Sequence, residues 1–202
     1  MRIRRTKLLD RTVNVRDATL CVIATEGEHT EKQYFAVFSN RRVRVWTLPT
    51  GEDHQSAPHH VLSRLDKFKQ EHDLNEEDTL WLMVDVDHRR AGELDPICRE
   101  AVQKGFGLAI SNPCFELWLL LHFAEADASD MRCGAVETRL RTVLGSYNKT
   151  NLNMELYHPQ MAEAIQRARA LDTNPQARWP DFPGTHVYKV VEMLYTSAEE
   201  SF

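Results

Sequence analysis

The sequence predicts an α/β protein, with a parallel sheet that helices flank and a helical C-terminal part. Between residues 15 and 125, short apolar runs alternate with segments of helical spacing, as in folds built from repeated strand–helix units. These runs also lack polar alternation, which is expected of strands buried on both faces of a sheet. We therefore expect an α/β core over residues 1–125 and a helical extension over residues 126–202, packed together as one compact unit.

Four strands are predicted in the first part of the chain. Thr19–Thr25 and Thr79–Val84 are apolar runs of strand length, and Val43–Leu48 is rich in β-branched and aromatic residues. Phe106–Ser111 is a further apolar run, which follows a glycine. Because a helical segment separates each strand from the next, we expect the strands to lie parallel.

A helix is predicted after each of these strands. The four helices are Thr30–Ser39, Ala57–His72, Leu94–Lys104 and Pro113–Phe123. Thr30 and Gln33 match a capping box, in which the first side chain caps the helix and the second bonds back to it. Gly105 ends the third helix, and Asn112-Pro113 begins the fourth.

The second part of the chain has mainly helical patterns. Helices are predicted over Gly134–Leu144, Gln160–Leu171 and Thr185–Tyr195. Asp172–Pro183 contains three prolines and is expected to be a loop.

The composition is that of an ordinary globular protein. The chain has 202 residues, of which 42% are hydrophobic and 27% charged. No stretch approaches the roughly 18–20 apolar residues that span a membrane. The N-terminus is basic, but no apolar segment of a signal peptide follows it, so we expect a cytoplasmic protein without a membrane partner.

The spacing of the cysteines and the net charge of the chain argue against two classes of function. The cysteines are far apart and form no Cys-x-x-Cys pair, which indicates reduced thiols rather than a zinc site. The net charge of −5 argues against a free-standing nucleic-acid binder, because such binders neutralise phosphates. Local basic clusters lie at Arg2–Lys7, Arg41–Arg44 and Arg89–Arg90, and such clusters are more often solvated faces.

Acidic side chains follow the predicted strands. Glu26 comes after the first strand, Asp85 and Asp87 come after the third, and Asn112 and Glu116 come after the fourth. The carboxyl ends of parallel strands share one edge of the sheet, which is where such sheets bind ligands. At least three carboxylates should therefore meet there.

Carboxylates brought this close must either gain protons or bind a cation. Oxygen ligands without cysteine favour Mg²⁺ or Mn²⁺ over zinc, so Glu26, Asp85 and Asp87 are the predicted metal ligands. A solvated strand end is the alternative for the two aspartates. Glu31 is either a ligand or a partner of the helix dipole, and Glu28 is either a ligand or exposed to solvent.

Glu116 interrupts an apolar helix, where a charge needs a partner. It either faces the acidic site or forms a structural pair with an arginine or lysine. His122 does not share its helical face and is expected to be a core or boundary residue.

These motifs resemble known families. A glutamate after the first strand, followed by Asp85-Val-Asp87 after the third, resembles the Toprim pattern. Ser111–Phe123, Tyr147–Lys149 and Gly184–Lys189 are similar to the signature of RloB-like proteins.

The resemblance implies a Toprim-like core and a place in bacterial anti-phage, abortive-infection loci beside an ABC/AAA-type ATPase. It implies that Glu26, Asp85 and Asp87 hold Mg²⁺ for phosphodiester cleavage, with Glu116 as the fourth acid. Lys149 or Lys189 would supply positive charge to the transition state.

Two functions follow as expectations. The first is a Mg²⁺-dependent nuclease effector, with RNA, particularly tRNA, somewhat favoured over DNA as the substrate. Tyr147 and Tyr188 could stack a base in such a protein, although core packing is the alternative for both. The second is a non-catalytic Toprim-like adaptor that docks on the ATPase. The sequence leaves open whether the chain forms a homodimer.

Overall fold

The computed structural model describes residues 18–51, 56–86, 91–130 and 132–199. Asp87, one of the predicted metal ligands, lies outside the described residues. Across the described part, no helix combines the length and apolar character that crossing a membrane requires.

The sheet of the described residues has the strand order β2-β1-β3-β4-β5. β1 (Thr19–Thr25), β2 (Val43–Leu48), β3 (Thr79–Asp85) and β4 (Gly107–Asn112) run parallel to one another. The predicted parallel core is therefore confirmed. β5 (Gly184–Thr185) was not predicted, and it pairs antiparallel with the end of β4.

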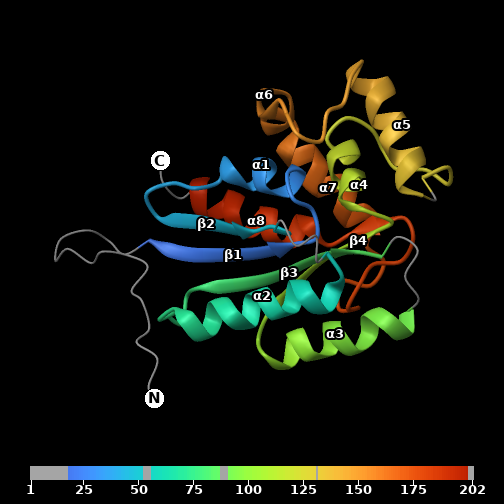
Figure 1. The fold of residues 1–202 in the computed structure, drawn as a ribbon. Coiled ribbons are helices and arrows are strands. Elements are labelled where there is room, and N and C mark those ends of the chain that lie inside the picture. The colour runs from blue at the N-terminus through green and yellow to red at the C-terminus, as the bar shows by residue number, and fades with distance from the viewer. Residues whose placement is uncertain (1–17, 52–55, 87–90, 131, 200–202) are drawn as a thin grey trace.

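Helices cover both faces of the sheet (Figure 1). One face carries α2 (Pro58–Glu71) and α3 (Ala91–Gln103), and their apolar side chains form a core with alternate residues of β1, β3 and β4. The other face carries α1 (Thr30–Ala36), α4 (Phe115–Leu121) and α8 (Val187–Glu199). This α/β arrangement is consistent with the Toprim-like core that the resemblance implied.

The remaining helices pack outside α4. They are α5 (Cys133–Leu144), α6 (Met154–Tyr157) with a 3-10 turn over His158–Gln160, and α7 (Met161–Leu171). Figure 1 shows them gathered on the α1 side of the sheet. The C-terminal part is thus helical apart from β5, and it reaches the sheet through β5 and α8. The boundary near residue 125 stays a prediction.

The predicted N-cap of α1 and the predicted start of the last helix are wrong. His29, not Thr30, precedes α1, and the Thr30 hydroxyl donates instead to the carbonyl of Lys149 at 3.2 Å. The Gln33 amide donates to the same carbonyl at 3.0 Å. These side chains attach a distant loop to α1 rather than capping the helix. The last helix begins at Val187, because β5 takes up Thr185.

Candidate functional site

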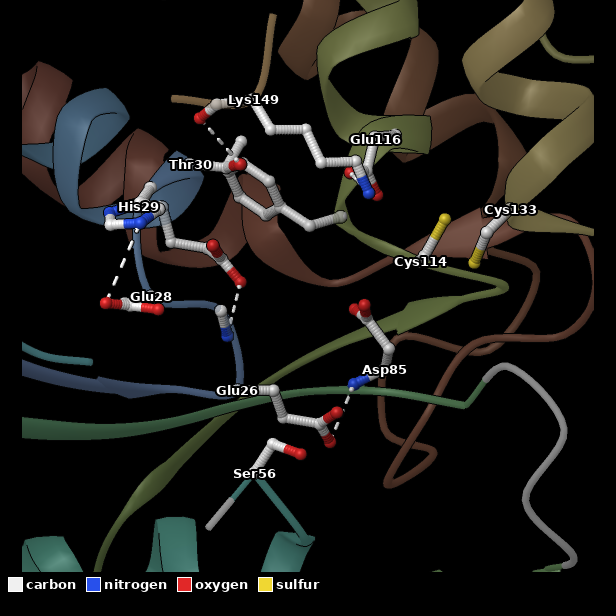
Figure 2. A pocket seen from close by; sticks show the side chains of 13 residues that line it. Glu26, Glu28, His29, Thr30, Ser56, Asp85, Cys114, Glu116, Cys133 and Lys149 are labelled. Atoms are coloured by element: carbon white, nitrogen blue, oxygen red, sulfur yellow. Dashed lines mark hydrogen bonds and ion pairs between the residues drawn. The ribbon is translucent and has the colours of Figure 1, made fainter. Parts of the chain in front are cut away.

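A cavity of about 400 Å³ opens at the carboxyl edge of the parallel sheet. Its walls come from the ends of β1 and β3, the starts of α1, α4 and α5, and the loop that carries Lys149. Figure 2 shows Glu26 and Asp85 at the sheet, with Glu116 and Lys149 on the opposite wall. The cavity therefore brings together side chains from elements far apart in the sequence.

Glu26 and Asp85 meet because β1 and β3 pair in parallel. The register places Thr25 opposite Met83, and β3 ends two residues later at Asp85, so Glu26 and Asp85 lie at the same edge of the sheet. The Glu26 carboxylate accepts a hydrogen bond from the backbone N–H of Asp85 at 3.3 Å. Burial raises the pKa of Asp85 well above its ordinary value, and the charges of the neighbouring glutamates raise it further.

Glu31 is the third acid of this cavity. It lies in the first turn of α1, is buried, and its carboxylate turns back to accept from the N–H of Gly27 at 3.1 Å. Burial raises its pKa to about 7, although the hydrogen bonds from the backbone oppose the shift. A Cβ atom at Gly27 would lie 2.1 Å from this carboxylate, so any larger residue there would displace the Glu31 side chain from this position.

Glu116 is the fourth acid, and an ion-pair network holds it. Its Oε1 lies 2.9 Å from the ammonium of Lys149 and accepts from the hydroxyl of Tyr147 at 3.3 Å. Lys149 also pairs with Glu137 of α5 at 2.7 Å. Burial lowers the pKa of Lys149, but the hydrogen bonds to Glu137 and Glu116 outweigh burial and raise it above its ordinary value.

The predicted site residues therefore separate into two groups. Glu26, Asp85, Glu116 and Lys149 line one cavity, whereas Lys189 does not. The Lys189 ammonium donates to the carbonyl of Pro175 at 2.7 Å. The prediction that Lys189 supplies positive charge to the acidic site is therefore wrong, because its ammonium lies outside the cavity.

Lys189 lies at the edge of a second polar cluster, whose other members are buried. Its ammonium lies 4.0 Å from Asp172, and the imidazole of His186 lies 3.1 Å from the same carboxylate. The Tyr188 hydroxyl donates to Asp172 at 2.8 Å. Burial lowers the pKa of His186 to about 4. Tyr188 is buried in this cluster, so its role is core packing, and its ring is not available to stack on a base.

Two other sequence expectations concern Glu28 and His122. Glu28 is exposed at the rim of the cavity and lies 3.7 Å from His29. His122 is buried in the core, where it shares a hydrogen bond of 3.2 Å with the Tyr34 hydroxyl. Burial lowers the His122 pKa to about 4, and the expected core role is confirmed.

The sequence did not reveal the role of Glu137 or of two cysteines. Cys114 and Cys133 both line the cavity, and their sulfur atoms lie side by side in Figure 2. The contact with Cys133 raises the pKa of the Cys114 thiol, as does burial. No local sequence pattern predicts that these residues lie at the site, because their positions relative to one another depend on where α5 packs.

The chemistry of the cavity suits a divalent cation with oxygen ligands. Five carboxylates line it when Glu28 at the rim is included, while Lys149 is the one lysine or arginine on its walls among the described residues. Within the same residues, no three acidic, histidine or cysteine side chains converge closely enough to hold a metal. Mg²⁺, however, is commonly held by one or two carboxylates together with water and phosphate oxygens. Glu26 and Asp85 fit that mode.

Comparisons with curated proteins and with solved structures found no match. A family profile described as RloB-like protein matches residues 21–194, a span that includes every residue named above as lining the cavity. It also contains the Ser111–Phe123 segment, whose pattern resembled that family. The chain belongs to the RloB-like protein family.

Proposed function

We propose that this protein is a metal-dependent nuclease and that the acidic cavity is its catalytic site. The observation that carries the proposal is the gathering of Glu26, Glu31, Asp85 and Glu116 around one space at the carboxyl edge of the sheet. Burial raises the pKa of Asp85, and repulsion from the neighbouring glutamates raises it further; a bound cation would relieve both costs. A cavity of this charge rejects a phosphodiester unless a cation neutralises it.

Each residue has a role in the proposed reaction. Glu26 and Asp85 hold Mg²⁺ or Mn²⁺, and Asp87 is expected to join them. When bound, the ion polarises a phosphoryl oxygen and lowers the pKa of an attacking water. Lys149 presents its ammonium from the opposite wall, where it offsets the charge of Glu116 and of a phosphate group. Glu137 restrains Lys149 in that position.

The biological setting is proposed from the family resemblance. The protein would be the effector of a cytoplasmic anti-phage system of the abortive-infection type, controlled by an ABC/AAA-type ATPase of the same locus. RNA, particularly tRNA, is favoured over duplex DNA as the substrate. Sequencing of RNA and DNA ends in cells that express both genes would identify the substrate.

A non-catalytic adaptor is the second candidate, and one observation favours it. Glu116 and Glu137 are both engaged by Lys149, so two of the acids near the cavity already have a structural use. In that case the module would dock on the ATPase and transmit its state without binding a metal.

Metal titration by calorimetry separates the two functions. The nuclease proposal expects binding of Mg²⁺ or Mn²⁺ at millimolar or lower concentration, and it expects Asp85→Asn to abolish that binding. Asp181→Asn is the matched control, because Asp181 is exposed and does not line the cavity. If wild type and Asp85→Asn gave the same heats, the metal site would be wrong and the adaptor would be favoured.

A further inference from the structure

An exposed tryptophan lies on the edge strand of the sheet. Trp46 in β2 is 47% exposed, and β2 is the terminal strand of the sheet order. Leaving so large an apolar ring in water is unfavourable, so an exposed tryptophan beside a hollow indicates a binding surface more often than an isolated exposed leucine would.

Trp46 forms one wall of a groove between β2 and α2. The groove has a volume of about 430 Å³, and Thr47, Leu48 and Pro49 continue the wall along the strand. The indole lies 6.0 Å from the ring of Phe68, between ring centroids. Phe68 in turn stacks on His72 at 4.1 Å. Phe68 is buried and supports the indole from within the core, so Trp46 is the ring that is open to a flat ligand.

The charges around the groove favour an anionic ligand. Arg64 and Lys67 of α2 line it against the single acid Glu71. Arg44 precedes Trp46 by two residues, so both side chains lie on the same side of the strand, and Arg44 is exposed. Arg41 is also exposed, just before the strand begins. This local positive excess contrasts with the net charge of −5 of the whole chain.

The groove is connected to the acidic cavity through the backbone of β1. A guanidinium nitrogen of Arg64 donates to the carbonyl of Thr25 at 2.6 Å, one residue before Glu26. The Thr50 hydroxyl donates to the carbonyl of Glu26 at 2.7 Å. Because β2 runs parallel to β1, the Pro49 end of the groove lies at the same edge of the sheet as the cavity. A ligand that extends along the groove can therefore reach the acids.

We propose that this groove binds single-stranded nucleic acid, with a base stacked on Trp46 and phosphates paired with Arg44 and Lys67. The inference rests on the proposed nuclease function, since it identifies the substrate of the same cavity as unpaired nucleic acid. Stacking requires an accessible base face, which a duplex does not offer without unpairing. An aromatic platform with flanking cations is the recurrent way in which proteins bind single strands without reading their sequence.

The test is fluorescence anisotropy with labelled oligo(rU) and oligo(dT) of about 12 nucleotides. EDTA is present, so that binding is measured without cleavage. We expect Trp46→Ala to weaken binding by roughly 5- to 150-fold, the range that loss of one stacked base produces. Trp46→Phe, which keeps a stacking ring, should recover most of the affinity. A thermal melt of each variant confirms that it is folded.

A charge reversal provides a second, independent measurement. Lys67→Glu should weaken binding and reduce its dependence on salt, because one phosphate contact is lost. Lys69→Glu is the matched control: it is on the same helix and makes the same charge change, but it lies outside the groove, where its ammonium donates to the carbonyl of Lys104. Binding by Lys69→Glu should equal that of the wild type.

The outcomes separate this inference from the proposed function. If Trp46→Ala bound both oligomers as tightly as the wild type, or if the wild type bound neither, the groove proposal would be wrong. If Trp46→Ala instead changed only a concentration-dependent self-association, the groove would be an interface between copies and the proposal would also fail. Suppose instead that wild type and Asp85→Asn bind the oligomers equally, that Trp46→Ala weakens both, and that neither protein cleaves the oligomers with Mg²⁺. The groove would then be a binding site for single strands, and the proposed nuclease activity would be wrong.

Discussion

Lys149 is expected to stabilise the acidic cavity more than any one of its acids does. Lys149→Met removes the cation that pairs with Glu116 and Glu137, and leaves Glu116 in a cavity that also holds Asp85. Breaking a buried ion pair from one side costs about 3–5 kcal/mol. Here the Glu116 side chain is 8% exposed but Lys149 is 49% exposed, so water screens the pair and the expected cost falls to about 1–3 kcal/mol.

The reverse substitution should cost much less. Glu116→Gln keeps the shape of the side chain and removes one negative charge from the cavity. Lys149 retains Glu137 at 2.7 Å, and the repulsion that raises the pKa of Asp85 is reduced. We therefore expect a change within about 0.5 kcal/mol. In the double variant, the cost of Lys149→Met should shrink by about 1 kcal/mol, because one of the acids left without a cation is gone.

Urea unfolding measures these differences. With a slope of about 2 kcal/mol per molar urea, Lys149→Met should lower the midpoint by about 1 M, and Glu116→Gln should leave it nearly unchanged. Lys104→Met is the matched control, since Lys104 also bridges two acids, Asp66 at 2.5 Å and Glu100 at 2.6 Å, but both of these carboxylates are more exposed than Glu116 and Glu137. If Glu116→Gln destabilised the protein as much as Lys149→Met, our account of the network would be refuted.

Glu31→Gln is expected to stabilise the protein above neutral pH. The folded-state pKa of Glu31 is raised from 4.5 to about 7, so the folded protein holds this proton more tightly than the unfolded chain, and stability falls as the pH rises from 4.5 to 7. The gain from Glu31→Gln should reach about 1–3 kcal/mol at pH 8 and vanish below pH 4.5, and Glu28→Gln at the exposed rim should show no such trend in unfolding experiments. A gain that did not depend on pH would show that Glu31 is not neutralised by burial. In cells, expression with the partner ATPase or a phage trigger should arrest growth, and Glu26→Gln and Asp87→Asn should each abolish the arrest at equal protein level. A fully toxic variant would remove that residue from the proposed ligands.

Much of the fold was predictable because its signals are local. β1 and β2 begin and end at the predicted residues. β1 is apolar because the sheet buries it on both faces, whereas the edge strand β2 was recognised from its β-branched and aromatic residues. The meeting of Glu26 and Asp85 was also predictable, because Glu26 follows one strand, Asp85 ends another, and parallel strands end at one edge of the sheet. The sequence by itself therefore determined the core and half of the cavity.

The other half of the cavity depended on the tertiary structure. Lys149 and Lys189 are both lysines in motif-like segments, and no local property separates them. The loop that carries Lys149 docks on Thr30 and Gln33 of α1, and this brings Lys149 to Glu116. β5 pairs with β4 just before α8 begins, and this places Lys189 of α8 near Asp172 instead. Such contacts join residues more than 70 positions apart, as do Ser111 and Thr185 across β4 and β5. Their energies appear only after the chain has folded, because packing rather than local propensity decides which distant side chains share a wall.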